Sequence, residues 1–205
     1  MALSSPQKHT ATNGYTLLEM LVVIAIIGIV VPVLFSSIQN LYKTHARTLS
    51  RALAVIETTK GVQEVVRDVR AAVYSESGAL PLVSIATSTL TLYSDTDYDG
   101  DVERIRYFLN GSAFTKGVIE PTSTSSYPAS TETLRVIVHN TTNTDTNTPL
   151  FRYFNATGTQ VTLASKILEV RRVEVQLIGS TRFGIETSEV RLRSSASIRN
   201  LKETY

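Results

Sequence analysis

The sequence predicts an α+β fold in which one long N-terminal helix packs on an antiparallel β-sheet. Three observations support this prediction. An apolar run follows Gly14 and reaches Phe35, and apolar residues then recur at helical spacing as far as Val73. The rest of the chain consists of short segments rich in β-branched and aromatic residues, separated by turn-forming residues. With 205 residues, the chain is long enough for one globular domain beyond the helix.

The apolar run is long enough to cross a membrane, which takes about 20 predominantly apolar residues in a helix. Between residues 15 and 35 the only formal charge is Glu19. An ionisable group in such a segment calls for a partner. If the chain were cut after Gly14, the new α-amino group of Tyr15 would lie one helical turn from Glu19. That amine would be protonated at neutral pH, because its reference pKa is about 8.

The residues around this carboxylate resemble the N-terminal signal of type IV pilins and type II secretion pseudopilins. The family pattern is a short polar leader, a Gly, an aromatic residue, T-L-x-E and an apolar helix; residues 14–19 read G-Y-T-L-L-E. The resemblance implies that a prepilin peptidase removes a leader, residues 1–14, by cutting between Gly14 and Tyr15. It also implies N-methylation of Tyr15 and insertion of residues 15–35 into a filament core. Asn13 replaces the usual Lys or Arg and Tyr15 the usual Phe, departures that bear on processing efficiency.

This segment has two alternatives to the pilin-type signal, a capping box and a secretory signal peptide. Thr16 and Glu19 have the spacing of a capping box, in which both side chains satisfy free N–H groups at a helix start. We expect this role to coexist with pairing of Glu19. A secretory signal peptide has an apolar core of about 7–15 residues and an A-x-A-like cleavage site after it. Here the run is longer and no such site follows it, so the pilin-type signal is favoured.

An amphipathic continuation of the helix is predicted over residues 36–75. We expect its apolar stripe to pack on the sheet of the same chain; a coiled coil is less favoured, because the spacing breaks between Thr58 and Gly61. Pro32, inside the span, lacks an N–H and is expected to kink or loosen the helix. The stripe consists of Ile38, Leu41, Leu49, Leu53, Ile56, Val62, Val66, Val69 and Val73.

A β-rich globular domain is predicted over residues 76–205. Asn110 and Gly111 form a two-residue hairpin signal between two of its strands. One long helix followed only by strands is also the pilin order. Length, strand content and the apolar pattern of residues 168–177 are similar to the larger minor pilins and pseudopilins, the J-like class. The expected strands are residues 88–94, 102–109, 112–119, 134–139, 150–155, 161–163, 167–178 and 189–199.

An acidic motif lies between the first two of these strands. Asp95, Asp97, Asp99 and Asp101 alternate in the run D-T-D-Y-D-G-D, and Glu103 follows closely. Alternating carboxylates around a glycine turn can converge on Ca²⁺, which takes six to eight oxygen ligands. The motif is not an EF-hand, because the twelfth place holds an arginine. A solvated acidic turn is the alternative, and calcium is the one cofactor that the sequence suggests.

Composition argues against several classes of function. Lys and Arg number 20 and Asp and Glu 18, for a formal charge of +2. Nucleic acid is therefore not expected as the main partner, because phosphate binding needs a concentrated basic face. The absence of cysteine excludes a disulfide framework and a thiolate metal site. His9, His45 and His139 fall in separate segments and form no general-base or metal-ligand spacing, so no enzyme is predicted.

The resemblance implies a structural subunit, a minor pilin or pseudopilin of a type IV pilus or type II secretion pseudopilus. Its implied partners are other pilin or pseudopilin subunits, the prepilin peptidase, the inner-membrane assembly platform and the membrane itself. We expect a single-pass protein of the bacterial inner membrane that passes into an extracellular or periplasmic filament. A major pilin is the alternative within this class. A membrane-anchored binding protein or adhesin with an intact N-terminus is the alternative outside it.

Overall fold

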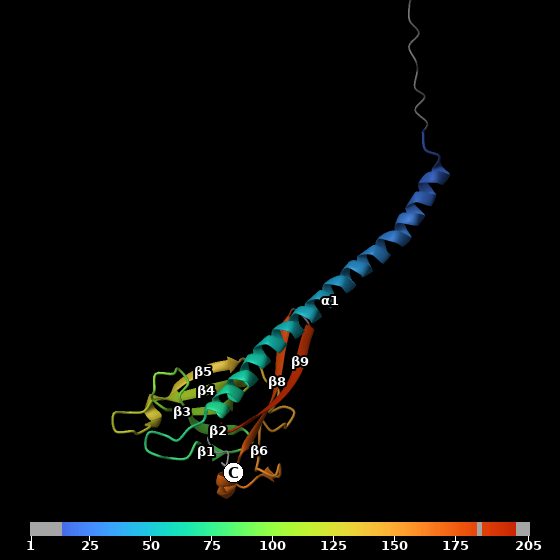
Figure 1. The fold of residues 1–205 in the computed structure, drawn as a ribbon. Helices are drawn as coiled ribbons and strands as arrows, with labels where there is room; N and C mark the ends of the chain where they lie inside the picture. Colours follow the sequence, from blue (N-terminus) through green and yellow to red (C-terminus); the bar gives the residue numbers. More distant parts are fainter. Residues whose placement is uncertain (1–13, 184–185, 200–205) are drawn as a thin grey trace, which may run out of the picture. The chain divides into compact units, whose positions relative to one another are not determined.

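The computed structural model describes residues 14–183 and 186–199 (Figure 1). The expected leader, apart from Gly14, lies outside the described residues. The chain divides into two compact units, Met1–His45 and Ala46–Tyr205. The predicted α+β class is confirmed, since in the described part of the chain one long helix precedes strands that all pair in antiparallel fashion.

The described part of the first unit is almost entirely helical. Helix α1, Leu17–Ala71, begins in this unit and ends in the second, and it continues unbroken through Pro32. In the stretch from Gly14 to His45 every side chain is exposed. Helix α1 is long and apolar enough to span a membrane, with a mean hydropathy of 2.9 in its most apolar stretch. Apolar side chains exposed on all faces of a helix indicate that its surroundings are lipid or protein rather than water.

The second unit contains two antiparallel sheets, whereas the sequence predicted one. The first sheet is a meander in the order β1-β2-β3-β4-β5, and the second has the order β7-β6-β8-β9. The first consists of β1 Leu82–Ile85, β2 Thr89–Ser94, β3 Glu103–Asn110, β4 Ala113–Ile119 and β5 Thr133–Val138, with the short 3₁₀ helix η1 Ala129–Thr131 before β5. The second consists of β6 Phe151–Phe154, β7 Gln160–Val161, β8 Arg172–Phe183 and β9 Glu186–Ser197, with the 3₁₀ helix η2 Ala164–Glu169 before β8.

The two sheets and the second half of α1 share one hydrophobic core. The helix contributes Val62, Val65 and Val69 to this core. Fully buried side chains of both sheets meet them there: Leu90, Leu92, Ile105, Tyr107 and Phe114 from the first sheet, and Phe151, Val173, Val175 and Leu177 from the second.

The buried face of α1 includes Val62 and Val69 of the apolar stripe that the sequence predicted, but it differs from that stripe nearer the N-terminus. Leu53 and Ile56 of that stripe are 44% and 53% exposed. The face that is buried instead begins with four small or polar residues: Ser50, Ala54, Thr58 and Gly61. A Cβ atom added at Gly179 of β8 would lie 1.9 Å from Oγ1 of Thr58. The prediction was wrong here because the backbones of helix and strand approach too closely for leucine or isoleucine to fit.

Three smaller differences concern an additional strand, the start of another strand and the position of a turn. Strand β1 was not predicted. Residues 167–169 belong to η2 and not to the strand that follows, which begins at Arg172. The β3–β4 hairpin turns at Gly111 and Ser112, since Asn110 pairs with Ala113, and Gly111 has the positive φ of 60° that a glycine-led turn requires.

Candidate functional site

The first candidate site is the segment that leads into α1. Gly14 and Tyr15 are both exposed, Tyr15 to 78%. The bond between them is therefore sterically open to a protease. Its cleavage and the methylation of Tyr15 stay predictions.

Thr16 caps the start of α1. Its Oγ1 accepts a hydrogen bond from the backbone N–H of Glu19 at 3.2 Å, and its carbonyl accepts one from Met20 at 3.2 Å. This confirms the Thr16 half of the expected capping box. Glu19 lies in the first turn, where the positive end of the helix dipole favours a negative charge. Among the ion pairs between described residues, none includes Glu19.

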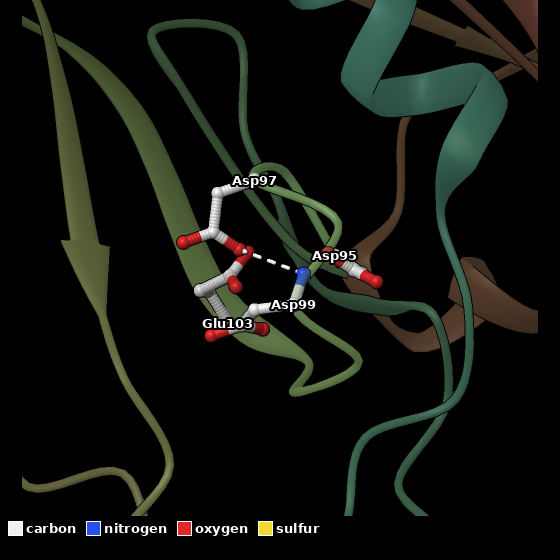
Figure 2. A group of neighbouring side chains, drawn as sticks. All are labelled: Asp95, Asp97, Asp99 and Glu103. Carbon is white, nitrogen blue, oxygen red and sulfur yellow. Dashed lines mark hydrogen bonds between the residues drawn. The ribbon is translucent and has the colours of Figure 1, made fainter.

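The second candidate site is the acidic loop, residues 95–102, between β2 and β3. Figure 2 shows the side chains of Asp95, Asp97 and Asp99 on this loop and that of Glu103 at the head of β3. One carboxylate oxygen of each lies within 4.8 Å of the others. The structure thus brings together three of the four aspartates that the sequence singled out.

Asp101 does not belong to this group, and Glu103 takes its place. Alternate side chains share one side of the chain only while the backbone stays extended. Gly100, with a φ of 100°, and Tyr98, with a φ of 66°, both bend the loop. The alternation therefore ends before Asp101.

Backbone amides within the loop already bond to its carboxylates. Asp95 accepts a hydrogen bond from the N–H of Tyr98 at 2.7 Å, and Asp99 accepts one from Asp101 at 2.9 Å. Asp97 accepts a longer one, 3.4 Å, from Asp99. Such bonds hold Asp side chains over a turn and explain why Asp and Gly suit this loop without any ion.

Glu103 differs from the three aspartates because it is buried, with an exposed fraction of 1%. Its Oε2 accepts hydrogen bonds from the N–H and the hydroxyl of Thr96 at 2.8 and 3.0 Å. Burial raises the pKa of Glu103, against the opposite effect of the two Thr96 bonds. Burial also raises the pKa of Glu120, and the charges of Asp97, Asp99 and Asp101 raise it further. The loop is thus a centre of negative potential.

A buried polar network between α1 and the first sheet was missed by sequence reasoning. Asp68, only 1% exposed, accepts hydrogen bonds from the Tyr107 hydroxyl at 2.5 Å and the Lys116 ammonium at 2.7 Å. Burial, and then the charge of Asp68, raise the pKa of Tyr107 well above its usual range, so this hydroxyl stays protonated and donates. The signal that could have revealed this pair was a charged residue, Asp68, directly before Val69 of the predicted apolar stripe.

A match to a known family falls on the first candidate site. The family described as the prokaryotic N-terminal methylation motif matches residues 10–31. The chain therefore carries a type IV pilin-type signal, followed by the apolar helix and the antiparallel sheets of a pilin-like architecture. A comparison with curated proteins found no match.

Proposed function

We propose that this protein is a minor pilin or pseudopilin, a non-enzymatic subunit of a type IV pilus or a type II secretion pseudopilus. A prepilin peptidase removes residues 1–14, and Tyr15 becomes the methylated N-terminus. Helix α1 anchors the subunit in the inner membrane until the assembly platform transfers it into the filament. The observation that carries this proposal is the match of residues 10–31 to the methylation motif, at the head of a helix with exposed apolar side chains.

The exposure of apolar side chains along α1 supports a role in assembly. From Leu17 to Tyr42 the large apolar side chains are all exposed, and the exposure continues on one face with Leu53 and Ile56. A membrane would cover the first of these stretches before assembly. Neighbouring copies of the same kind of helix would cover both stretches in a filament, where apolar burial provides the driving force.

Glu19 would fix the axial position of each subunit. An apolar helix surface has no strong preference for one register along its neighbours, whereas an ion pair is specific in position. After cleavage the nearest strong cation is the amine of Tyr15. We propose that Glu19 pairs with the Tyr15 amine of a neighbouring subunit, a partner that a carboxylate in an apolar surrounding needs.

The first test is intact-mass analysis and N-terminal sequencing of the protein from membranes, with and without a co-expressed prepilin peptidase. We expect the peptidase to give a chain that begins at Tyr15 with one added methyl group. A Gly14→Val variant should stay full length and serve as the control. An unprocessed wild-type chain in the presence of an active peptidase would contradict the proposal and favour a permanently anchored binding protein.

The second test concerns assembly. Glu19→Ala and Glu19→Val should still be cleaved and inserted into the membrane, but the sheared filament fraction should contain far less of them than of wild type. Glu19→Asp keeps the charge and should restore part of the incorporation. Normal incorporation of Glu19→Ala would refute the pairing. The processing test would still decide whether the protein is a cleaved filament subunit or a permanently anchored protein.

A further inference from the structure

The group formed by Asp95, Asp97, Asp99 and Glu103 holds four carboxylates within a few ångströms of one another. Acidic side chains at a turn are common, and the hydrogen bonds within the loop account for the three aspartates. They do not account for Glu103, which is buried at the head of β3 and belongs to the same group. The case for a ligand therefore rests on this glutamate.

One oxygen of Glu103 has no hydrogen-bond partner. Oε2 bonds to Thr96, whereas Oε1 is buried and has no partner among the residues that the structure describes. Ser94 lies opposite Glu103 in the β2–β3 register, but its own buried hydroxyl is likewise without a partner there. A buried acceptor that makes no bond costs about 1–3 kcal/mol, and more if it is charged. A cation between the four carboxylates would remove this cost and their mutual repulsion together.

The donor atoms determine which cation fits. All four groups offer carboxylate oxygen, and oxygen ligands suit Ca²⁺, Mg²⁺ and Mn²⁺ rather than metals that prefer nitrogen or sulfur. Mg²⁺ needs a nearly ideal octahedron and usually binds one or two carboxylates, while Ca²⁺ accepts six to eight oxygens in irregular geometry. Four carboxylates on a bent loop match Ca²⁺ better, with water and backbone carbonyls completing the shell.

We propose that the loop before β3 is a calcium site in which Asp95, Asp97, Asp99 and Glu103 are the side-chain ligands. The site differs from an EF-hand, because its glutamate stands at the ninth place of the loop and not at the twelfth. Glu103 also forms the first pair of the β2–β3 ladder, with Ser94. Calcium would therefore hold the loop end of this hairpin together and make the stability of the second unit calcium-dependent.

Calorimetric titration of the full chain in detergent micelles with CaCl₂, after removal of divalent ions, tests this proposal. We expect one site with a Kd of about 1 mM or tighter, in the range of extracellular calcium modules. The melting temperature of the β-sheet signal in circular dichroism should rise with CaCl₂ and rise less with MgCl₂ at equal concentration. Absence of both heat and a melting shift at millimolar CaCl₂ would overturn the proposal. That outcome is expected if a proton shared between Glu103 and an aspartate, and not a cation, relieves the repulsion.

Variants identify the ligands. Glu103→Gln and Asp97→Asn should each weaken calcium binding by at least about tenfold. Asp97 is exposed, so its variant tests the site even if Glu103→Gln folds poorly. Asp101→Asn removes the same charge from the same loop outside the group and should lower affinity far less. Equal losses for Asp97→Asn and Asp101→Asn would indicate loose attraction to an acidic loop and would contradict the ligand assignment.

Discussion

The two halves of α1 have the same backbone structure and opposite burial. Along residues 17–45 every side chain is exposed, although most of them are apolar. Along residues 46–71 one face is buried, and it includes polar residues such as Thr58 and Asp68. The first half thus exposes apolar side chains, while the buried face of the second half includes a charged residue and several small ones.

This contrast shows that hydropathy and burial report different things. Hydropathy in the first half indicates the surroundings that the helix needs, lipid before assembly and neighbouring subunits after it in the proposed function. Burial in the second half is determined by where the helix meets β4, β5 and β8 of its own chain. Substitutions on the buried face of the second half should therefore change folding stability, and those on exposed apolar positions of the helix should change association.

The largest effect is expected from Asp68→Ala. Removing one partner of a buried ion pair costs about 3–5 kcal/mol when the other charge is left without a partner. Lys116, only 3% exposed, would keep Glu64 at 3.2 Å as its remaining partner, so the loss should lie near the lower end of this range. Urea unfolding of the full chain in detergent micelles, followed by circular dichroism, measures this loss of unfolding free energy.

Two controls belong with this measurement. The double variant Asp68→Leu with Lys116→Met removes both charges and should recover part of the stability, since the buried Tyr107 hydroxyl still lacks its acceptor. Ile24→Ala, on the exposed half of the helix, should leave the same unfolding transition unchanged. A loss below about 1 kcal/mol for Asp68→Ala would mean that the pair is not buried.

The next effect is expected from Gly179→Ala. A methyl group there would meet Oγ1 of Thr58 at 1.9 Å, so helix and strand must separate. Overpacking of this kind costs about 1–3 kcal/mol. Thr58→Ala in the same chain removes the nearest atom and should restore part of the loss, and a double-mutant cycle gives the coupling. Additive losses would show that α1 and β8 do not meet at these residues.

A smaller effect is expected from Thr16→Ala in the first half. Loss of an N-cap costs about 1 kcal/mol of helix stability. Amide hydrogen exchange at Glu19, whose N–H bonds to Thr16, should become faster. Thr16→Ser keeps the hydroxyl and should exchange like wild type. Unfolding of the second unit should be the same in all three proteins.

The smallest change in stability is expected from Leu53→Ala, on the exposed face of the second half. Its side chain is 44% exposed, so the loss should be below about 0.5 kcal/mol. Val65→Ala, at 1% exposure, is the matched buried variant and should lose at least about 1.5 kcal/mol. Among correctly folded protein, Leu53→Ala should lower incorporation into filaments more than Val65→Ala does. Comparable losses of unfolding free energy for the two variants would contradict the assigned face.

Much of the architecture could be predicted from local sequence patterns. The apolar run, the Thr16 cap and the strand-forming segments each depend on residues close together in the chain, so periodicity and turn chemistry were sufficient to find them. The strand pairing into two sheets was not predicted, because local pattern specifies that a segment is a strand and not which strand it joins. Residues 167–169 show the same limit, since a short apolar stretch fits a strand or a 3₁₀ turn.

The acidic loop divides in the same way. The alternating aspartates and Gly100 indicated a turn that could bring carboxylates together, and Asp95, Asp97 and Asp99 do lie together. The exclusion of Asp101 depends on backbone angles within the loop, and the burial of Glu103 depends on its pairing with β2. Neither the exclusion of Asp101 nor the burial of Glu103 can be predicted from the spacing of residues in the sequence alone.

Local sequence patterns suffice to predict the N-terminal signal, the membrane-length helix and the α+β order, because each follows from composition and short-range periodicity. The tertiary structure alone places Gly61 and Thr58 on the buried face in place of Leu53 and Ile56. It also decided that Asp68 meets Lys116, and that Glu103 joins the carboxylate group. The physical reason is that burial depends on how closely distant segments approach, and that distance is set by the whole fold.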